Sequence, residues 1–584
     1  MSGERQADVA VIGGGLGGIA AALAASRAGC SVLLVEPYSR VGGQVTTQAV
    51  AALDEHPHIE SFGASASYRE FRDRVRAGYG GRANPGDGWV SRLCFEPAVG
   101  HRVLTTMLDE AGVRVHTGLS AVEVERTGDR ITGVRLSDDT VVRADVYCDA
   151  TEAGDLLPLA GVPWVIGSEG RDAYGESHAV PGGPEPAAQQ SFTWCVLVEH
   201  RPGEDHTEPE PAGYARWRDR FGFEVEGWDG TVHRYRMFTD GPDGRLPFWT
   251  YRRLRTEPPE LAVLNWSGND CWDADPIHDP VRAEALGREL SASFVHWLRT
   301  EAPREDGGRG FPGLRVAPEA AGTADGYAEA PYLREARRIA VPHPVTQHDL
   351  AVVPGRARAA PQPGSLGVTW YHCDLHARHG HPDSVYTPTA PFAIPAHSLV
   401  PEGCGNLLAA GKNLGATQAA ATAYRVHHGE WAVGEAAGAA AARCVAEQRP
   451  VPAVRDDPGL LARVQYDLAA AGVPLAWIAD VPTGTPLFTA AHLLAAYGAL
   501  DADRAVDLAV RPSEPCTPAD ARALHDAAAD VRTALGLPPR TAPKGAAPDG
   551  TATDGTARWQ DAATWRELAL GMLPELARPT GTPR

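Results

Sequence analysis

A glycine-rich turn between two apolar strand patterns, close to the start of the chain, constrains the fold most strongly. The turn has the spacing GxGxxG, and a carboxylate ends the second strand pattern; the residues are Gly13, Gly15, Gly18 and Glu36. In such a βαβ unit the first glycine permits the tight turn, the second leaves space for a pyrophosphate, and the third lets helix and strand pack closely. The pattern therefore predicts a dinucleotide-binding unit in which Glu36 accepts hydrogen bonds from a ribose.

The next loop favours FAD over NAD as the dinucleotide. In segment 36–44 a glutamate is followed, after five residues, by the paired glycines Gly42 and Gly43. This segment resembles a signature of the glutathione-reductase-like flavoproteins, in which the paired glycines let the backbone pass close to the flavin. The resemblance implies that Gln44 and Thr46 also lie beside the cofactor.

A second marker of that superfamily lies at residues 141–155. It resembles the strand and turn that return the chain to the Rossmann sheet, which implies a place near the cofactor for Asp149. Glu152 stands where the superfamily usually has glycine. This sub-family is therefore expected to have its own turn chemistry.

Composition limits the classes of partner. The 584 residues exceed what one core fills, which predicts roughly two or three domains. A formal net charge of −20 disfavours nucleic acid and anionic membranes. The chain starts with polar residues and has no apolar run of about 20 residues. We therefore expect no signal peptide and no membrane span, and hence a cytoplasmic location. Nine cysteines without CxxC pairs predict free thiols and no zinc site.

The predicted fold class is α/β, with four parts along the chain. We expect a glutathione-reductase-type FAD-binding Rossmann half with an inserted β-meander, a mixed α+β substrate or cap domain, a return to the FAD-binding domain with a flavin-contacting turn, and a small helical accessory tail. Their predicted ranges are 1–160, 161–330, 331–450 and 451–584. Helices are predicted at 430–447, 460–471, 489–500 and 518–535, and disorder at 541–558, which is rich in Gly, Ala, Thr, Pro and Asp.

A series of ordered motifs resembles the bacterial FAD-dependent oxidoreductases. The blocks include GGQVTTQAV at 42–50, NPGDGWVSRLC at 84–94, LNWSGND at 264–270 and GKNLG at 411–415, and the resemblance covers residues 5 to 445. It implies bound FAD, a small-molecule substrate and a flavin-contacting turn that includes Lys412, Asn413 and Gly415. Where relatives usually read Thr-His-Ile-Thr-Asn, this chain has TQAAA at 417–421. This departure predicts a specialised substrate pocket beside Gln418.

Flavin-dependent dehydrogenation needs a base that accepts the proton of an O–H or N–H group. His372, Asp374 and His376 alternate on a predicted strand, so their side chains are expected to point the same way. The leading interpretation is that Asp374 orients His376 as the base. A metal site is the less favoured interpretation, and hydrogen-bonded structural groups are the third. His56 is a second candidate base or a covalent flavin attachment point, although an ordinary loop histidine fits equally well.

Two enzyme classes and one non-catalytic class fit these patterns. The leading one is a dehydrogenase or oxidase of specialised metabolism that removes hydride from a C–OH or C–N bond of a polar small molecule, bound near Gln48, His376 and Gln418. The alternative is an NAD(P)H-dependent flavin monooxygenase, which the lack of a second GxGxxG turn disfavours. The third is a protein that uses FAD structurally. A homo-oligomeric state is left open.

Overall fold

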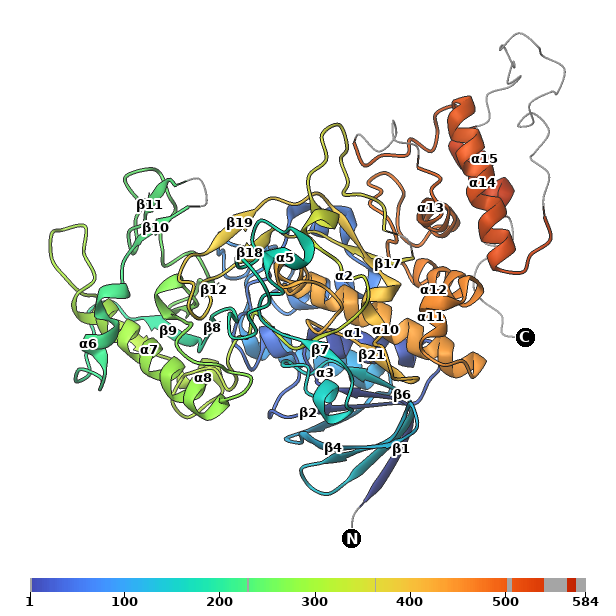
Figure 1. The fold of residues 1–584 in the computed structure, drawn as a ribbon. Helices are drawn as coiled ribbons and strands as arrows, with labels where there is room; N and C mark the ends of the chain where they lie inside the picture. Colours follow the sequence, from blue (N-terminus) through green and yellow to red (C-terminus); the bar gives the residue numbers. More distant parts are fainter. Residues whose placement is uncertain (1–2, 228–229, 363, 501–506, 540–563, 574–584) are drawn as a thin grey trace.

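A seven-stranded sheet forms the centre of the computed structural model, which describes residues 3–227, 230–362, 364–500, 507–539 and 564–573 (Figure 1). Strands β3, β2, β1 and β6 lie side by side in that order and run parallel, β21 is parallel to the end of β6, and β5 and β4 continue the sheet antiparallel. The strands are β1 (Glu4–Ile12), β2 (Val32–Glu36), β3 (Arg114–Thr117), β4 (Ala121–Thr127), β5 (Arg130–Leu136), β6 (Val141–Asp149) and β21 (Leu407–Ala409).

The parallel strands are apolar because both faces of the sheet are covered. Every residue of β2 is buried, and the sheet separates two groups of buried side chains. This is the pattern expected for a parallel sheet with elements packed on both sides. The structure therefore has the mixed α/β architecture with a parallel sheet that the sequence predicts. The first apolar segment gives β1 and α1 (Leu16–Arg27), with the glycine turn between them.

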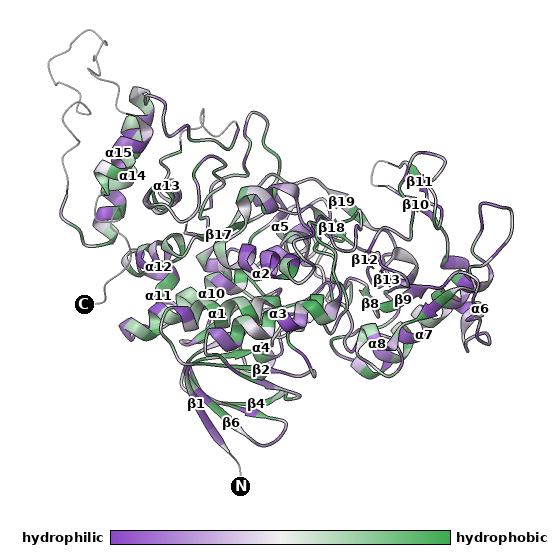
Figure 2. Ribbon diagram, turned by 180° about the vertical axis from the view of Figure 1, so that it is seen from behind, coloured by the Kyte–Doolittle hydropathy of each residue, from purple (hydrophilic) through white to green (hydrophobic). Residues whose placement is uncertain are grey.

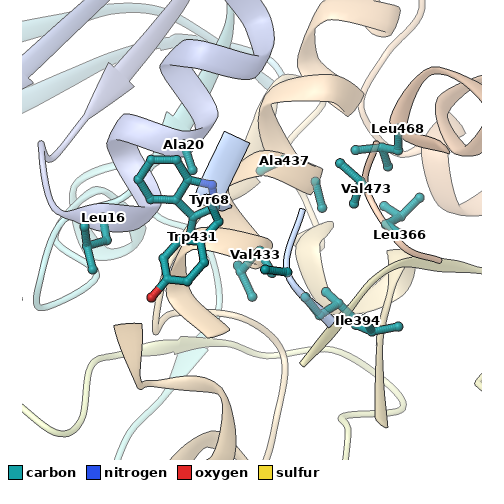
Figure 3. Packing of buried hydrophobic residues seen from close by; sticks show 14 of the residues in the cluster. Leu16, Ala20, Tyr68, Leu366, Ile394, Trp431, Val433, Ala437, Leu468 and Val473 are labelled. Carbon is teal, nitrogen blue, oxygen red and sulfur yellow. The ribbon is translucent and has the colours of Figure 1, made fainter. Parts of the chain in front are cut away.

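Helix α10 (His427–Glu447) packs directly on α1 and confirms the helix predicted at 430–447. A Cβ atom at Gly434 would overlap with the carbonyl oxygen of Gly17, and one at Gly438 would overlap with that of Ala21. The two helix backbones can approach this closely because these positions have no side chain. Trp431 and Val433 of α10 pack into the core that Figure 3 shows.

A separate four-stranded antiparallel sheet lies to one side of the main sheet (Figure 1). Its strands are β12 (Arg253–Arg255), β13 (Glu260–Leu264), β9 (Val196–His200) and β15 (Leu314–Val316), and the long helix beside it is α7 (Pro280–Thr300). Aromatic side chains fill the space between sheet and helix, among them Phe248, Trp266, Phe294 and Trp297. The segment predicted as the substrate or cap domain thus has its own core.

Short strand pairs and helices complete the fold between the two sheets. The pairs are β7 (Trp164–Val165) with β16 (Arg338–Ile339), β8 (Phe192–Thr193) with β14 (Asp270–Cys271), β10 (Glu224–Glu226) with β11 (Val232–Arg234), β17 (Ser365–Thr369) with β20 (Phe392–Pro395), and β18 (Cys373–Leu375) with β19 (Val385–Thr387). The other helices of this part are α2 (Ala66–Ala77), α3 (Pro97–Glu110), α4 (Leu156–Leu159), α5 (Arg171–Tyr174), α6 (Tyr214–Trp217), α8 (Pro318–Ala321) and α9 (Gln418–Tyr424).

The C-terminal part consists of helices that pack on the core. They are α11 (Ala453–Asp456), α12 (Pro458–Ala470), α13 (Pro486–Ala496), α14 (Pro518–Ala534) and α15 (Trp565–Met572). Helices are therefore present where 460–471, 489–500 and 518–535 were predicted to be helical. Figure 2 shows hydrophobic and hydrophilic residues mixed along α14, as expected for a helix with one buried face. The stretch predicted to be disordered, 541–558, lies outside the described residues.

Candidate active site

The first glycine turn brings α1 against the end of β6. Gly13 has φ of +102°, and a Cβ there would overlap with the carbonyl of Ala150. A Cβ at Gly18 would overlap with the carbonyl oxygen of Gly13. Gly15 is the N-cap residue of α1 and has an ordinary φ of −66°. The first and third glycines thus permit close backbone packing, while Gly15 lies at the helix N-terminus, where backbone N–H groups attract anions and where a Cβ would lie 2.8 Å from Oε1 of Glu152.

Glu36 lies at the end of β2, close to this turn. Its carboxylate accepts hydrogen bonds from the backbone N–H groups of Gly14 at 2.6 Å and Tyr38 at 3.0 Å. The side chain is almost fully buried. Burial raises the pKa of Glu36 to about 7, although the two backbone hydrogen bonds oppose the shift. The structure thus places Glu36 where the sequence predicts a ribose-binding carboxylate.

The second glycine pair lies directly beside the first turn. Gly42 and Gly43 have φ of +117° and +47°, and the N–H of Gly42 donates to the carbonyl oxygen of Gly14 at 2.7 Å. A Cβ at Gly43 would lie 2.9 Å from the Cα of Gly15 and 3.8 Å from Nε2 of Gln48. Gln48 is fully buried, and neither polar atom of its amide has a hydrogen-bond partner among the described residues. An unpaired buried amide points to a polar ligand beside this turn.

Three charged side chains gather around the same two turns. Lys412 donates a hydrogen bond to Glu152, and a Cβ at Gly15 would lie 2.8 Å from Oε1 of Glu152. Glu430, at the start of α10, accepts a hydrogen bond from Gln44. Burial raises the pKa of Glu430 to about 7, while Lys412 opposes the shift. Burial lowers the pKa of Lys412, but Glu152 and Glu430 outweigh burial, so the net pKa is raised.

This arrangement changes the role expected of Lys412. The sequence predicts that its ammonium donates to the flavin edge, whereas in the structure it is buried and paired with Glu152 beside Gly15. Glu152 occupies the position where the superfamily usually has glycine. The ammonium of Lys412 is buried and needs a partner of opposite charge, which the carboxylate of Glu152 supplies. The two residues therefore act as a pair.

Four other residues predicted to contact the cofactor mainly shape the turns. Thr46 donates to the carbonyl of Val41 at 2.9 Å, and Asn413 Nδ2 donates to that of Asp149 at 2.9 Å. Asp149 Oδ1 accepts from the hydroxyl of Thr151 at 2.7 Å. A Cβ at Gly415 would lie 2.7 Å from Val341. These contacts join the Gly42 turn, the end of β6 and the turn after β21 into one surface.

A cavity of about 300 Å³ opens between the first glycine turn and residues from the segments 276–284 and 331–333. Its lining includes Gly13, Gly15, Glu36 and Thr151 on one side, and Ile277 and Leu333 on the other. The glycine cradle, the buried carboxylate and the unpaired amide of Gln48 fit the two ends of an adenine-dinucleotide flavin. The residues present therefore fit FAD, which Glu36 and the two glycine turns would hold.

His376 lies between two carboxylates. Its Nδ1 is 2.9 Å from Oδ2 of Asp270, and its Nε2 is 3.1 Å from Oδ2 of Asp374. Asp374 is the partner that the sequence predicts, and Asp270, on β14, is a second partner. Neutral imidazole has one N–H and imidazolium has two, so both bonds to ionised carboxylates exist together only when His376 is protonated.

Two buried arginines hold these carboxylates. Arg334 Nη2 donates to Asp270 Oδ1 at 2.8 Å, and Arg425 Nη2 donates to Asp374 Oδ2 at 3.1 Å. Burial raises the pKa of Asp270, but Arg334 and His376 outweigh it and lower the pKa to about 2. Burial also raises the pKa of Asp374, but His376 and Arg425 hold it well below its ordinary value. Both carboxylates are therefore ionised at neutral pH.

Arg425 also connects this histidine to the glycine turns. Gln44 Nε2 donates to the backbone carbonyl of Arg425 at 2.9 Å, and His427 Nε2 is 2.8 Å from the carbonyl oxygen of Val50. The segment after α9 therefore lies against the loop that follows Gly43. A continuous series of contacts runs from the predicted flavin turn through Arg425 and Asp374 to His376.

His56 and Gln418 lie in environments that differ from that of His376. The ring of His56 stacks on Trp370 with centroids 3.5 Å apart, and burial lowers the pKa of His56 to about 4. Gln418 is buried, and its Nε2 donates to the carbonyl of Ala188 at 2.6 Å and to Glu335 at 2.8 Å. The sequence places both among the catalytic candidates. In the structure, the amide N–H groups of Gln418 donate to protein acceptors, so Gln418 has a structural role beside the site.

Sequence reasoning missed several residues of this site as functional groups. Asp270 and Glu430 lie in blocks that resemble the family but have no role assigned from the sequence, and Arg334 lies just before such a block, at 335–339. The signal available in the sequence was the presence of charged residues within or beside these blocks, as in LNWSGND at 264–270 and REARRI at 334–339. All nine cysteines are described and none forms a disulfide. Within the described residues, no three His, Cys, Asp or Glu side chains are grouped as metal ligands would be.

Solved structures similar to this chain are flavoproteins and related enzymes of low sequence identity. A geranylgeranyl bacteriochlorophyll reductase-like protein from Thermoplasma acidophilum is 11% identical over 91% of this chain and 99% of its own, with a TM-score of 0.31. AlpK is 22% identical over 35% of this chain and 40% of its own, with a TM-score of 0.22. The anhydrotetracycline hydroxylase OxyS from Streptomyces rimosus is 16% identical over 35% and 38%, with a TM-score of 0.20.

These TM-scores are too low to transfer geometry, so the assignment rests on the sequence family. No curated protein matches the chain. In the part of the chain that the structure covers, no helix is long and apolar enough to cross a membrane. The family model described as FAD dependent oxidoreductase matches residues 8–468, which is most of the chain. The chain belongs to the FAD-dependent oxidoreductase family, and its cofactor is FAD.

Proposed function

We propose that this chain is a flavin-dependent dehydrogenase or oxidase that removes a hydride from a C–OH or C–N bond of a polar small molecule. The observation that supports this proposal is the Asp270–His376–Asp374 arrangement, which contacts the predicted flavin turn through Arg425. FAD supplies the hydride acceptor when bound. The chain's own task is then to bind the substrate, orient it and accept its hydroxyl or amine proton.

In this proposal Nε2 of His376 accepts the proton. Asp270 holds the Nδ1–H and fixes the ring, because this carboxylate is buried and is itself fixed by Arg334. The substrate hydroxyl or amine takes the place of Asp374 at Nε2. Asp374 keeps its second partner, Arg425, when it gives up this bond. The ring must therefore bind substrate in its neutral form, with its remaining proton on Nδ1.

The two glycine turns hold the cofactor in the same proposal. Gly13 and Gly15 leave space for the pyrophosphate, Glu36 accepts from the ribose, and Gly42 and Gly43 let the backbone approach the flavin. The Glu152–Lys412 pair lies beside Gly15, where the ammonium of Lys412 offsets the negative charge of Glu152. Water is kept from this side because Gln44 and Gln48 are fully buried.

The test is anaerobic reduction of the bound flavin by a panel of alcohols, amines, hydroxy acids and amino acids. Loss of the visible flavin absorbance without NAD(P)H supports the proposal. His376→Ala should slow this reduction by roughly 10²- to 10⁴-fold, the usual effect of losing a general base, and should leave FAD bound. His278→Ala is the matched control, because His278 forms a similar 2.8 Å pair with Asp275 at an exposed position.

Two results would contradict the proposal. Loss of absorbance only with NAD(P)H would identify a monooxygenase. Reduction of the His376→Ala variant at the wild-type rate would remove His376 from the mechanism and leave His56 as the next candidate.

A further inference from the structure

Arg252 is a buried cation with few partners. Its side chain is 10% exposed, and its guanidinium lies over the ring of Tyr251. Nη2 donates to the Tyr251 hydroxyl at a long 3.4 Å and lies 3.6 Å from Oδ2 of Asp54. Nε and Nη1 are buried and have no hydrogen-bond partner among the described residues. A guanidinium has five N–H donors and stays charged, so leaving donors buried and unpaired is costly.

Asn265 adds a second unpaired donor at the same place. Its Oδ1 accepts from Arg334 at 3.3 Å and from Thr193 at 3.4 Å, which leaves Nδ2 as the donor without a partner among the described residues. Arg252 and Asn265 both line one small cavity of about 10 Å³. This volume suits a single atom the size of a water oxygen. An oxygen atom there could accept hydrogen bonds from both side chains.

Arg252 belongs to a group of charged side chains near His376. Arg252, Arg334 and Arg425 face Asp54, Asp270 and Asp374, and His376 lies between Asp270 and Asp374. The three arginine side chains are at most 10% exposed, whereas those of Asp54, Asp374 and His376 are 24–25% exposed. The arginines thus form the closed floor of the cluster, and the more accessible residues form its rim.

We propose that Arg252 and Asn265 bind one oxygen of a substrate carboxylate, so that the substrate class is a hydroxy acid or an amino acid. A carboxylate oxygen is a charged acceptor for the unpaired donors of Arg252 and Asn265, and one oxygen atom is what the small cavity fits. A phosphate fits less well, because it brings close to two charges and three terminal oxygens. This inference rests on the proposed function for the oxidisable C–OH or C–N bond, but carboxylate binding can be measured without turnover.

The experiment is calorimetric titration of the FAD-bound protein with benzoate, with the uncharged isostere benzamide and with inorganic phosphate. Benzoate should bind the wild type saturably, and its Kd should rise about 10- to 100-fold in Arg252→Gln, the usual effect of losing a charged hydrogen bond. Benzamide and phosphate should bind much more weakly. Arg220→Gln is the control, because Arg220 is already paired with both oxygens of Asp273 at 2.8 and 2.9 Å.

Several outcomes would overturn the inference. The first is that benzoate does not bind saturably at millimolar concentration, and the second is that wild type and Arg252→Gln bind benzoate equally well. The third is that phosphate binds more tightly than benzoate. The fourth is that benzamide binds as tightly as benzoate, which would indicate that the small cavity holds water only. If Arg252→Gln does not fold, Arg252→Lys replaces it, because lysine keeps the charge and loses the planar fork. If neither folds, the wild-type comparison of benzoate with benzamide and phosphate decides.

The results also separate this inference from the proposed function. Flavin reduction by neutral alcohols, with no benzoate binding, would uphold the proposed function and overturn the carboxylate site. Benzoate binding that depends on Arg252, with no flavin reduction by any hydroxy or amino acid, would uphold the carboxylate site and count against the proposed function.

Discussion

Asp270 and His376 are 106 positions apart in the sequence, yet Oδ2 of Asp270 lies 2.9 Å from Nδ1 of His376. Asp270 belongs to β14, which pairs with β8, and His376 directly follows β18. The contact therefore joins the two-stranded sheet at the base of the second domain to the segment that leads back to the flavin turn. It fixes the ring of His376 from its buried side and leaves Asp374 at the more accessible side.

The buried pair Asp270–Arg334 should contribute strongly to stability. In Asp270→Asn, Arg334 keeps its charge but loses its partner at 2.8 Å, so the free energy of unfolding should fall by about 3–5 kcal/mol. Arg218→Ala breaks an exposed pair with Glu301, which solvent screens, and should cost far less. Chemical denaturation of both variants measures the difference. Equal losses of unfolding free energy in the two variants would show that the buried Asp270–Arg334 pair stabilises the protein no more than an exposed pair does.

Gly15→Val should abolish FAD binding. Because Gly15 has an ordinary φ of −66°, valine adds no backbone strain there, but its side chain would fill the space at the helix N-terminus and displace the carboxylate of Glu152, which lies 2.8 Å from a Cβ. Gly183→Val is the matched control, since a Cβ at Gly183 meets nothing within 4 Å. The ratio of flavin to protein absorbance after reconstitution with FAD measures the effect. Full FAD content in Gly15→Val would mean that the pyrophosphate does not bind at this turn.

Gly434→Ala should destabilise the protein although alanine is the better helix former. The new Cβ would overlap with the carbonyl oxygen of Gly17 and force α1 and α10 apart, at a cost of about 1–3 kcal/mol or more. Ala446→Gly, at an exposed position of the same helix, should cost only about 1 kcal/mol through helix propensity. Thermal unfolding distinguishes the two. A Gly434→Ala variant with raised Tm would contradict the close packing of these helices.

The contribution of Asp149 to the stability of the FAD-free protein should fall as pH rises from about 4 to 7. Burial raises the pKa of Asp149 to about 7, from an ordinary value of about 3.9. Between these values the folded chain binds more protons than the unfolded chain, so raising the pH favours unfolding. The pKa values of Glu36 and Glu430, also about 7, act in the same direction. Asp149→Asn should reduce the slope, which urea denaturation across this pH range measures. An unchanged slope would show that Asp149 stays ionised in the folded protein.

The sequence alone was enough to predict the parallel sheet, the glycine turn and the helix now seen as α10. Each depends on a local pattern: apolar strands, glycine spacing and a run of small residues fix the backbone wherever the rest of the chain lies. The position of Glu36 followed for the same reason, because it ends β2, the strand that follows the turn and α1 in the local βαβ unit. Asp374 and His376 also meet, as predicted from alternate positions of a strand, although β18 covers only Cys373–Leu375 and His376 directly follows it.

Only the tertiary structure decided which distant groups meet. Asp270 reaches His376, Lys412 pairs with Glu152, and Gln418 donates to Glu335. None of these contacts has a local signature, because each joins segments that are brought together by strand pairing and helix packing far along the chain. A buried charge needs a partner, but any oppositely charged residue can satisfy it, so the fold and not the sequence pattern selects which one does.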